Sequence, residues 1–267
     1  MIITKLQGGL ANQIFQWAYG KFLSDKYNTP LYLDVDSYKS QFGVTKRSFS
    51  LNCFPNLKYN IMPDERNISL WSTENNKTKI YQLNDDFNYK ELLYDESSHY
   101  FLNGYWQCEK YFKQIEYDIK KELRPSDEDL VKLSKIIPDN SVSIHIRRTD
   151  YVTSNGYHPV QTIDYYKKAL SLIGDYKNIV VFSDDIPWCK ENLTFDNIIF
   201  IEGNKDYADL WLMSLCEHNI IANSSFSWWG AWLNENKNKK VVAPLNWFGQ
   251  QSNTNQSDIV PESWIKI

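Results

Sequence analysis

The sequence predicts an α/β protein with mostly parallel, doubly wound sheets, and three observations lead to that prediction. Between Val142 and Ala243, five short apolar segments alternate with helical segments. The chain also opens with an apolar strand, a glycine turn and a long helix, which is the order of a Rossmann-like unit. Finally, apolar and polar residues alternate over 142–146 and lead directly into Arg147 and Arg148.

The composition narrows the class of protein. The 267 residues suffice for one large domain or two smaller ones, and 42% apolar residues exclude a disordered chain. A net charge of -4 argues against a nucleic-acid partner. The four cysteines are scattered, so neither a zinc site nor a disulfide framework is indicated. With no signal peptide and no long apolar run, we expect a soluble, cytoplasmic protein.

The first half begins with a strand from Ile2 to Leu6, the turn Gly8–Gly9 and a helix over 12–26. Glycines let a backbone pass close to a ligand, and a helix N-terminus favours an anion or polar group. A tight turn without a ligand is the alternative, because the full GxGxxG pattern is absent.

A second strand, over 31–35, ends beside Asp34 and Asp36. This spacing is a DxD, which holds a metal in some sugar transferases but is also common by chance. Residues 38–84 read as loops and short helices. A strand, a turn and a helix start follow over 101–112, where Trp106 and Gln107 are predicted to stack on and hydrogen-bond a sugar; burial of Trp106 is the alternative.

A helix over 111–123 is broken by Arg124–Pro125–Ser126, which we take as the boundary between domains 1–125 and 126–267. In the second domain we expect helices over 162–173, 188–193, 207–217 (capped by Asp206) and up to Leu233, and strands over 142–146, 178–182, 198–201, 219–222 and 241–243.

The arginine pair is the strongest candidate site. In an open α/β sheet the carboxyl ends of strands face the ligand crevice, and guanidinium groups match phosphate oxygens bidentately. Arg147 and Arg148 therefore indicate a diphosphate site, with Asp150 holding an arginine or accepting a hydrogen bond from a ligand hydroxyl. A surface Arg–Asp pair is the alternative, and His145 read alone is a core histidine.

Two later loops share the crevice with the arginines. Asp184 and Asp185 follow the next strand and are predicted to hydrogen-bond a ribose or base. Asn223, Ser224, Ser225, Phe226 and Ser227 follow a third strand at a helix start, where hydroxyls and free N–H groups form a second phosphate grip. Ordinary N-capping is the alternative for the serines. No GxxxxGK[ST] is present, so a P-loop kinase is excluded.

Three stretches make a resemblance specific: GGLANQIFQWAYG (8–20), HIRRTDY (145–151) and SSFSWWGAWL (224–233). They resemble signature segments of glycosyltransferase family 11, the α-1,2-fucosyltransferases that use GDP-β-L-fucose. LYLDV (31–35) and FLNGYWQCEKYF (101–112) also resemble family segments, so the likeness spans nearly the whole chain. Ala11 stands where the family usually has glycine.

The resemblance implies a GT-B-like fold, with two Rossmann-like domains facing a cleft, the donor on the C-terminal domain and no metal requirement. It also implies that Arg148 contacts the pyrophosphate, with Arg147 and His145 in support, and that Asp150 orients an arginine or the fucose. Gly8, Gly9, Asn12 and Gln13 would line the cleft. The last ~20 residues are expected to pack back on the first domain.

The implied reaction moves L-fucose with inversion to the 2-hydroxyl of a β-galactoside, and Asp150 and Asp36 are the candidate general bases. A fucosyltransferase of another linkage, such as α-1,6, and a glycan-binding module without turnover are the alternatives. A lipid-linked acceptor at the inner membrane face fits such an enzyme. The sequence leaves the acceptor's identity and the oligomeric state open.

Overall fold

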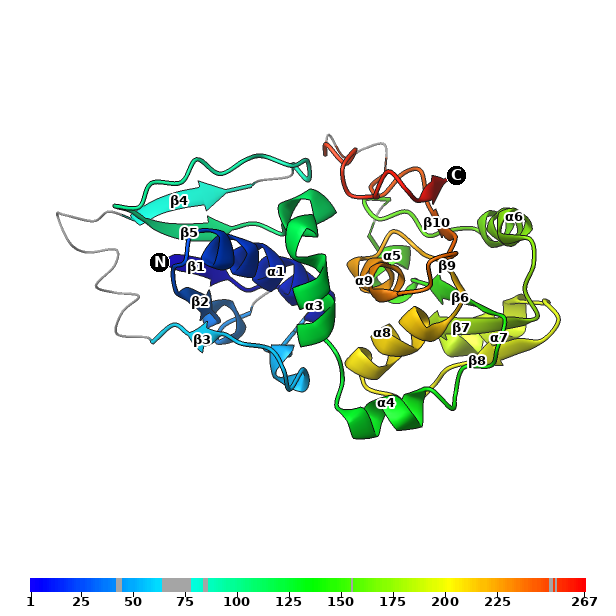
Figure 1. Ribbon diagram of the computed structural model, residues 1–267. Helices are drawn as coiled ribbons and strands as arrows, with labels where there is room; N and C mark the ends of the chain where they lie inside the picture. The colour runs from blue at the N-terminus through cyan, green and yellow to red at the C-terminus, as the bar shows by residue number, and fades with distance from the viewer. Residues whose placement is uncertain (42–44, 64–77, 84–85, 155, 250–251, 253) are drawn as a thin grey trace. The chain divides into compact units, whose positions relative to one another are not determined.

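The computed structural model describes residues 1–41, 45–63, 78–83, 86–154, 156–249, 252 and 254–267 (Figure 1). These residues form two units, each built on its own sheet. Unit 1 comprises Met1–Arg124 with Ser257–Ile259, and unit 2 comprises Pro125–Gln256 with Val260–Ile267. The chain passes from one to the other between Arg124 and Pro125, where the sequence carries its Arg-Pro-Ser break.

Unit 1 contains a parallel sheet of five strands in the order β3-β2-β1-β5-β4. The strands are β1 (Ile2–Lys5), β2 (Leu31–Asp34), β3 (Asn60–Ile61), β4 (Thr78–Gln82) and β5 (His99–Asn103). The chain runs outward from β1 through β2 to β3 and then returns on the other side of β1. The sheet order therefore reverses between β1 and β5, and ligands bind at such reversals in open α/β sheets.

Helix α1 (Leu10–Lys26) covers this sheet and is buried on more than one face (Figure 1). Ile14 and Ala18 lie on the apolar stripe that the sequence shows, but Trp17 and Tyr19 are also buried. The reason is that the segment around Phe112 covers another face of α1. The Phe15 and Phe112 rings pack with 5.9 Å between their centroids. The segment around Phe112 forms short 3-10 turns (Glu109–Tyr111, Lys113–Ile115) before α3 (Glu116–Glu122), where the sequence predicted one continuous helix.

Unit 2 contains a parallel sheet of six strands in the order β11-β10-β9-β6-β7-β8. They are β6 (Ser141–Ile146), β7 (Asn178–Ser183), β8 (Ile198–Phe200), β9 (His218–Ile220), β10 (Val241–Ala243) and β11 (Ile265–Lys266). The predicted parallel, doubly wound sheet is confirmed. Its strand order reverses between β6 and β9, so the topological switch point of this sheet lies between these two strands.

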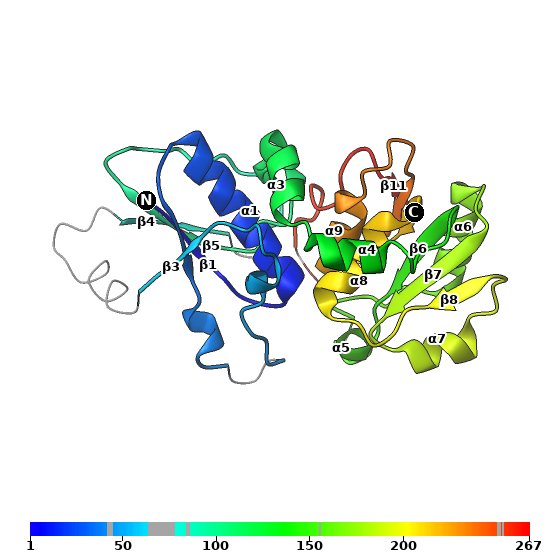
Figure 2. The ribbon, with the colours of Figure 1, turned by 60° about the horizontal axis from the view of Figure 1, so that its bottom comes forward.

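Helices cover both faces of the second sheet (Figure 2). They are α4 (Asp127–Leu133), α5 (Thr149–Val152), α6 (Ile163–Ile173), α7 (Ile186–Asn192), α8 (Asp206–Leu215) and α9 (Ser225–Leu233). One core joins α6 and α7 to the sheet through Tyr166, Leu170 and Cys189, packed on Ile144 and Val181. The other face carries α8 and α9. Because both faces are covered, β6 is buried along its whole length.

Some elements differ from the sequence-based prediction for identifiable reasons. The strands β3, β4 and β11 are short or largely exposed, so they lack an apolar run and were missed. Lys205 occupies the N-cap of α8 and Asp206 is its first helical residue, so the predicted cap is wrong by one position. Part of the predicted loop region, namely residues 42–44, 64–77 and Asn84, lies outside the described residues.

Candidate functional site

The switch point of unit 2 gathers most of the predicted donor residues. Arg147 and Arg148 follow β6, Asp184 and Asp185 follow β7, and the segment 223–227 follows β9. All three strands are parallel, so their carboxyl ends meet at one edge. The Tyr151 hydroxyl donates to the carbonyl of Asn223 at 2.9 Å and links the first loop to the third.

Arg147 is committed to the protein's own carboxylates. Its guanidinium contacts Asp150 at 2.7 Å and Asp184 at 3.2 Å, and it lies over the Tyr151 ring. Two carboxylates neutralise its charge and fix its orientation, so Arg147 holds the loop, and its contact with a ligand stays a prediction. Asp150 thereby takes the arginine-holding role that the sequence allowed for it.

Arg148 is held in a different way. Its Nε donates to Asp185 at 3.2 Å, and its guanidinium carbon lies 3.7 Å from the centroid of the Trp188 ring. Among the described residues, no hydrogen bond reaches its terminal Nη atoms. The side chain retains 19% exposure. Arg148 therefore presents a fixed, unoccupied fork, the geometry that phosphate oxygens accept bidentately.

The two aspartates after β7 organise this loop. Asp184 accepts from the backbone N–H of Arg148 at 2.9 Å and from the Thr149 hydroxyl. Asp185 accepts from Arg148 through one oxygen and from the backbone N–H of Trp188, at 3.2 Å, through the other. Each carboxylate thus bonds to the protein through both oxygens. A contact of either with a ribose or base stays a prediction.

The start of α9 is partly open and partly internal. Ser224 caps the helix by accepting from the N–H of Phe226 at 3.3 Å. Ser225 and Phe226 are partly exposed there, next to backbone N–H groups of the first turn. Ser227 is fully buried, and its hydroxyl donates to the carbonyls of Ala222 and Ser224. The predicted phosphate grip therefore rests on Ser224, Ser225 and the helix N–H groups, with Ser227 internal.

Asn223 serves as a connector between segments that the sequence does not bring together. It is 1% exposed, accepts from the Gln161 side chain at 3.0 Å and donates to the carbonyl of Trp247 at 2.9 Å. With the Tyr151 bond to its carbonyl, this one side chain and its backbone fix the start of the α9 turn. The buried amide therefore has a structural reason that needs no ligand.

His145 lies inside the sheet directly before the arginine pair. It is 4% exposed, and its Nδ1 has no partner among the described residues. Burial and the nearby Arg147 charge lower the pKa of His145 to about 3, so the imidazole is neutral near pH 7. Its ring lies 5.7 Å from the Phe226 ring. His145 is therefore part of the core of unit 2, and its support of the arginine pair stays a prediction.

The glycine turn of unit 1 is built for close packing. Gly8 has a φ of +79°, and a Cβ there would come within 2.6 Å of the Asn12 amide. The Gly8 carbonyl accepts from the Gln13 amide and the Tyr38 hydroxyl, both at 3.1 Å. Gln13 is fully buried and also bonds to Ser48 and Ser50. Gln13 therefore ties the turn to the following loop.

Trp106 follows the buried alternative. It is 1% exposed, and its ring stacks on Tyr81 at 5.5 Å and packs against Tyr19 at 4.8 Å, so its faces are covered by protein. Gln107 follows β5, beside the reversal of strand order in unit 1, and donates to the Asn12 side chain at 2.9 Å. Gln107 thus joins the segment after β5 to the first turn of α1, and the contact of either residue with a sugar stays a prediction.

Asp34 and Asp36 differ in exposure. Asp34 is 9% exposed, its pKa is raised by burial, and it accepts from the N–H of Asp36 at 2.9 Å. Asp36 is half-exposed and pairs with Lys39 at 2.8 Å. In the part of the chain that the structure describes, no group of three His, Cys, Asp or Glu side chains is arranged to hold a metal ion.

Several site residues escaped the sequence-based prediction. Thr149, Tyr151 and Trp188 surround the arginine pair. Thr149 and Tyr151 directly follow predicted residues, and Trp188 comes three positions after Asp185. In unit 1, the exposed Arg47 guanidinium lies about 3.9 Å from the position a Cβ at Gly9 would occupy, and no described carboxylate pairs with it. Its contact depends on a loop whose path the sequence does not reveal.

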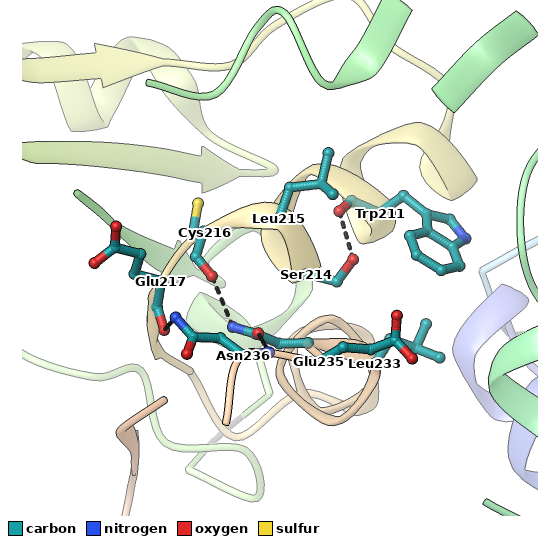
Figure 3. A pocket seen from close by; sticks show the side chains of 9 residues that line it. Trp211, Ser214, Leu215, Cys216, Glu217, Leu233, Glu235 and Asn236 are labelled. Carbon is teal, nitrogen blue, oxygen red and sulfur yellow. Dashed lines mark hydrogen bonds between the residues drawn. The ribbon is translucent and has the colours of Figure 1, made fainter. Parts of the chain in front are cut away.

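Unit 2 also contains a small pocket (Figure 3). It is lined by the ends of α8 and α9 and by Cys216, Glu217 and Asn234. Cys216 and Glu217 precede β9, and Asn234 precedes β10, so the pocket lies at the amino ends of these parallel strands, opposite the switch-point edge. Its volume of about 200 Å³ is below the range of small-molecule sites. The described part of the chain has no helix long and apolar enough to cross a membrane.

The two parallel-sheet α/β units have the architecture of the GT-B class of glycosyltransferases. A crystal structure of POFUT1 in complex with GDP-fucose aligns with a TM-score of 0.51 at 13% identity, covering 89% of this chain and 95% of that one. A POFUT1 complex with GDP gives a TM-score of 0.50 at 12% identity, with coverage of 89% and 95%. At such low identity the likeness concerns the fold alone.

The family follows from the sequence comparison. The profile of Glycosyl transferase family 11 matches residues 4–267, and the chain belongs to this family. The expected family membership and the GT-B fold are thereby confirmed.

Three curated relatives illustrate the range of activities. An Escherichia coli alpha-1,2-colitosyltransferase is 35% identical over 297 residues, covering 100% of this chain and 99% of that protein. The E. coli O-antigen biosynthesis glycosyltransferase WbnK is 33% identical over 303 residues, covering 98% and 99%. Galactoside alpha-(1,2)-fucosyltransferase 2 of Hylobates lar is 25% identical over 180 residues, covering 57% and 50%. The chain is therefore an α-1,2-glycosyltransferase of family 11, with its sugar open between these relatives.

Proposed function

We propose that the protein transfers L-fucose from GDP-β-L-fucose to the 2-hydroxyl of a terminal β-galactoside and inverts the anomeric centre. The observation that carries the proposal is the Arg148 fork, clamped by Asp185 and Trp188 with its terminal nitrogens unoccupied by the described protein. A leaving diphosphate gains negative charge as its bond to the sugar breaks, and preorganised donors stabilise that charge best. The α9 N-terminus supplies further donors at the same edge.

Inversion requires in-line attack by the acceptor hydroxyl, helped by a general base. Asp150 and Asp36 remain the candidates. Each is an exposed carboxylate next to a cation of its own segment, Arg147 and Lys39 respectively. We propose that no metal is required, because Arg148 and the helix donors supply the positive charge that a metal provides elsewhere.

Colitose is a second candidate donor sugar, because the colitosyltransferase relative is 35% identical over the full chain. Colitose is L-fucose without its 3-hydroxyl, so both sugars would present the same GDP to the arginine loop. For the acceptor we propose a surface polysaccharide of the O-antigen kind, carried on a lipid, on the ground of the likeness to WbnK.

The test incubates the protein with GDP-fucose or GDP-colitose and a β-galactoside in EDTA, beside Arg148→Ala. We expect GDP release and an α-1,2 product by NMR, with a higher kcat/KM for GDP-fucose. Arg148→Ala should lose roughly 10²-fold or more in kcat/KM. A product of another linkage, or a preference for GDP-colitose, would overturn the stated reaction. Activity only after added Mn²⁺ would overturn its metal independence, and GDP binding without transfer to any galactoside would favour the glycan-binding module.

A further inference from the structure

The Arg148 side chain is held on two sides by residues of the α7 start. The Trp188 indole covers one face of the guanidinium, with 3.7 Å from the guanidinium carbon to the ring centroid. The Asp185 carboxylate accepts a hydrogen bond from the Arg148 Nε at 3.2 Å. We call Asp185 and Trp188 the clamp. Because they hold the guanidinium by its Nε and by one face, both Nη atoms point away from them.

Asp185 and Trp188 are joined to each other in the first turn of α7. Asp185 is the N-cap of α7 and accepts from the backbone N–H of Trp188 at 3.2 Å through the oxygen that Arg148 does not use. Its own N–H donates to Ser183 at 3.0 Å. Cys189, the next residue, is fully buried, and Trp188 packs against the same core. The indole is therefore anchored to the sheet, and its position does not depend on Arg148.

An aromatic partner suits a phosphate-binding arginine better than a second carboxylate. Arg147 shows the other arrangement, in which two carboxylates occupy its Nη atoms. An indole face attracts a guanidinium through its quadrupole, excludes water from one side and uses none of the N–H donors. The clamp thus restricts the rotamers of Arg148 before any ligand binds, which lowers the ordering cost of binding.

We propose that Trp188 is a positioning residue for the donor site: it acts through Arg148, holding the guanidinium fork in the orientation that binds the diphosphate of the GDP-sugar. This inference rests on the proposed function of Arg148. A purely structural Trp188 would fill space against the core, and any apolar side chain of similar reach would replace it.

The first experiment compares wild-type protein, Trp188→Phe and Trp188→Leu by GDP titration calorimetry and steady-state kinetics. Trp188→Leu keeps an apolar side chain but removes the aromatic face, so we expect GDP affinity to fall roughly 2- to 30-fold. The KM for the donor should rise, whereas the KM for the acceptor should stay unchanged. Trp188→Phe should recover most of the affinity. Equal affinity in the Leu and Trp proteins would overturn the proposal.

Phe195→Leu is the matched control, because Phe195 packs against the same core and no ring contact, hydrogen bond or ion pair joins it to Arg148. We expect it to lower the melting temperature as much as Trp188→Leu does and to leave GDP affinity unchanged. If both variants lose affinity in proportion to their lost stability, Trp188 acts only through packing.

A double-mutant cycle shows whether Trp188 acts through the arginine. Arg148→Lys keeps the charge but removes the planar fork, so Trp188→Leu should cost little further affinity in that background. Additive losses would mean that Trp188 contacts the ligand directly, which would overturn the positioning role. Failure of the wild-type protein to bind GDP would instead refute the proposed function. Binding by wild type with no effect of Trp188→Leu would refute this inference alone.

Discussion

At the scale of single residues, the structure separates side chains that look equivalent in the sequence. Arg147 and Arg148 are adjacent, yet one is saturated by Asp150 and Asp184 and the other presents free Nη atoms. The difference arises in the turn after β6, where Arg148 is the N-cap of α5 and reaches Asp185 and Trp188, whereas Arg147 reaches Asp150 and Asp184. The predicted division of labour between the two arginines stays a prediction, and its test is the Arg148→Ala comparison.

The general base can be found by isosteric substitution at Asp150 and Asp36. Asparagine keeps the size and hydrogen-bonding reach of each side chain and removes its basicity, so the true base should lose roughly 10²- to 10⁴-fold in kcat. The other variant should keep its kcat. Asp150→Asn also weakens the Arg147 pair, which would raise the KM for the donor. If both variants retain most of the wild-type kcat, neither residue is the base.

His145 should make the protein less stable in mild acid. Its folded pKa of about 3 lies below the usual 6.5, so the native state excludes a proton that the unfolded chain takes up. Below pH 6.5 stability therefore falls as the pH falls, by about 2 kcal/mol between pH 7 and pH 5 from this group alone. Urea unfolding at both pH values should show a smaller loss for His145→Gln. Equal losses in the two proteins would contradict a neutral, buried imidazole.

At the scale of elements, caps and turns place the chemistry. The carboxyl ends of β6 and β9 meet at the reversal of strand order, and α9 begins where β9 has ended. In unit 1 the corresponding reversal, between β1 and β5, carries the glycine turn and Gln107. Each sheet thus directs its candidate site to the edge that the doubly wound topology leaves open.

Ser224 and Thr162 allow the two uses of an N-cap to be separated. Ser224 caps α9 at the candidate site, and Thr162 caps α6 by accepting from the N–H of Tyr165 at 3.2 Å. Alanine at either position should cost about 1 kcal/mol of unfolding free energy. Only Ser224→Ala should also weaken GDP binding, by roughly 2- to 5-fold, because it disturbs the helix start at the proposed diphosphate site. A loss of affinity in Thr162→Ala would show that stability alone explains the effect.

At the scale of the whole molecule, donor binding should change amide hydrogen exchange only in the loops of the candidate site. GDP added to the full-length protein should slow amide hydrogen exchange in residues 147–151, 183–188 and 223–228, because the ligand suppresses local opening there. The lining of the pocket in Figure 3, residues 214–217 and 233–236, lies at the other end of β9 and should exchange unchanged. Protection concentrated in that lining would move the nucleotide site to the pocket.

Much of the architecture was readable from the sequence. Buried parallel strands such as 142–146 and 178–183 carry apolar runs, and helix caps such as Thr162 and Ser224 are local signals. The edge strands β3 and β4 were not readable, because exposed edges impose no apolar pattern. The continuous helix expected over 111–123 failed at its start, where packing of Phe112 and Tyr111 against α1 favours short turns.

The sequence by itself determined the class of fold, the family and the loops that form the candidate site, because strand periodicity, turn residues and signature stretches are local properties. Only the tertiary structure decided which side chains are free to act. Trp106 is covered by Tyr19 and Tyr81, Ser227 is turned inward, and Arg148 is clamped by Trp188 from a helix forty residues later in the chain. Exposure and partnership depend on contacts between distant segments, and no local pattern encodes them.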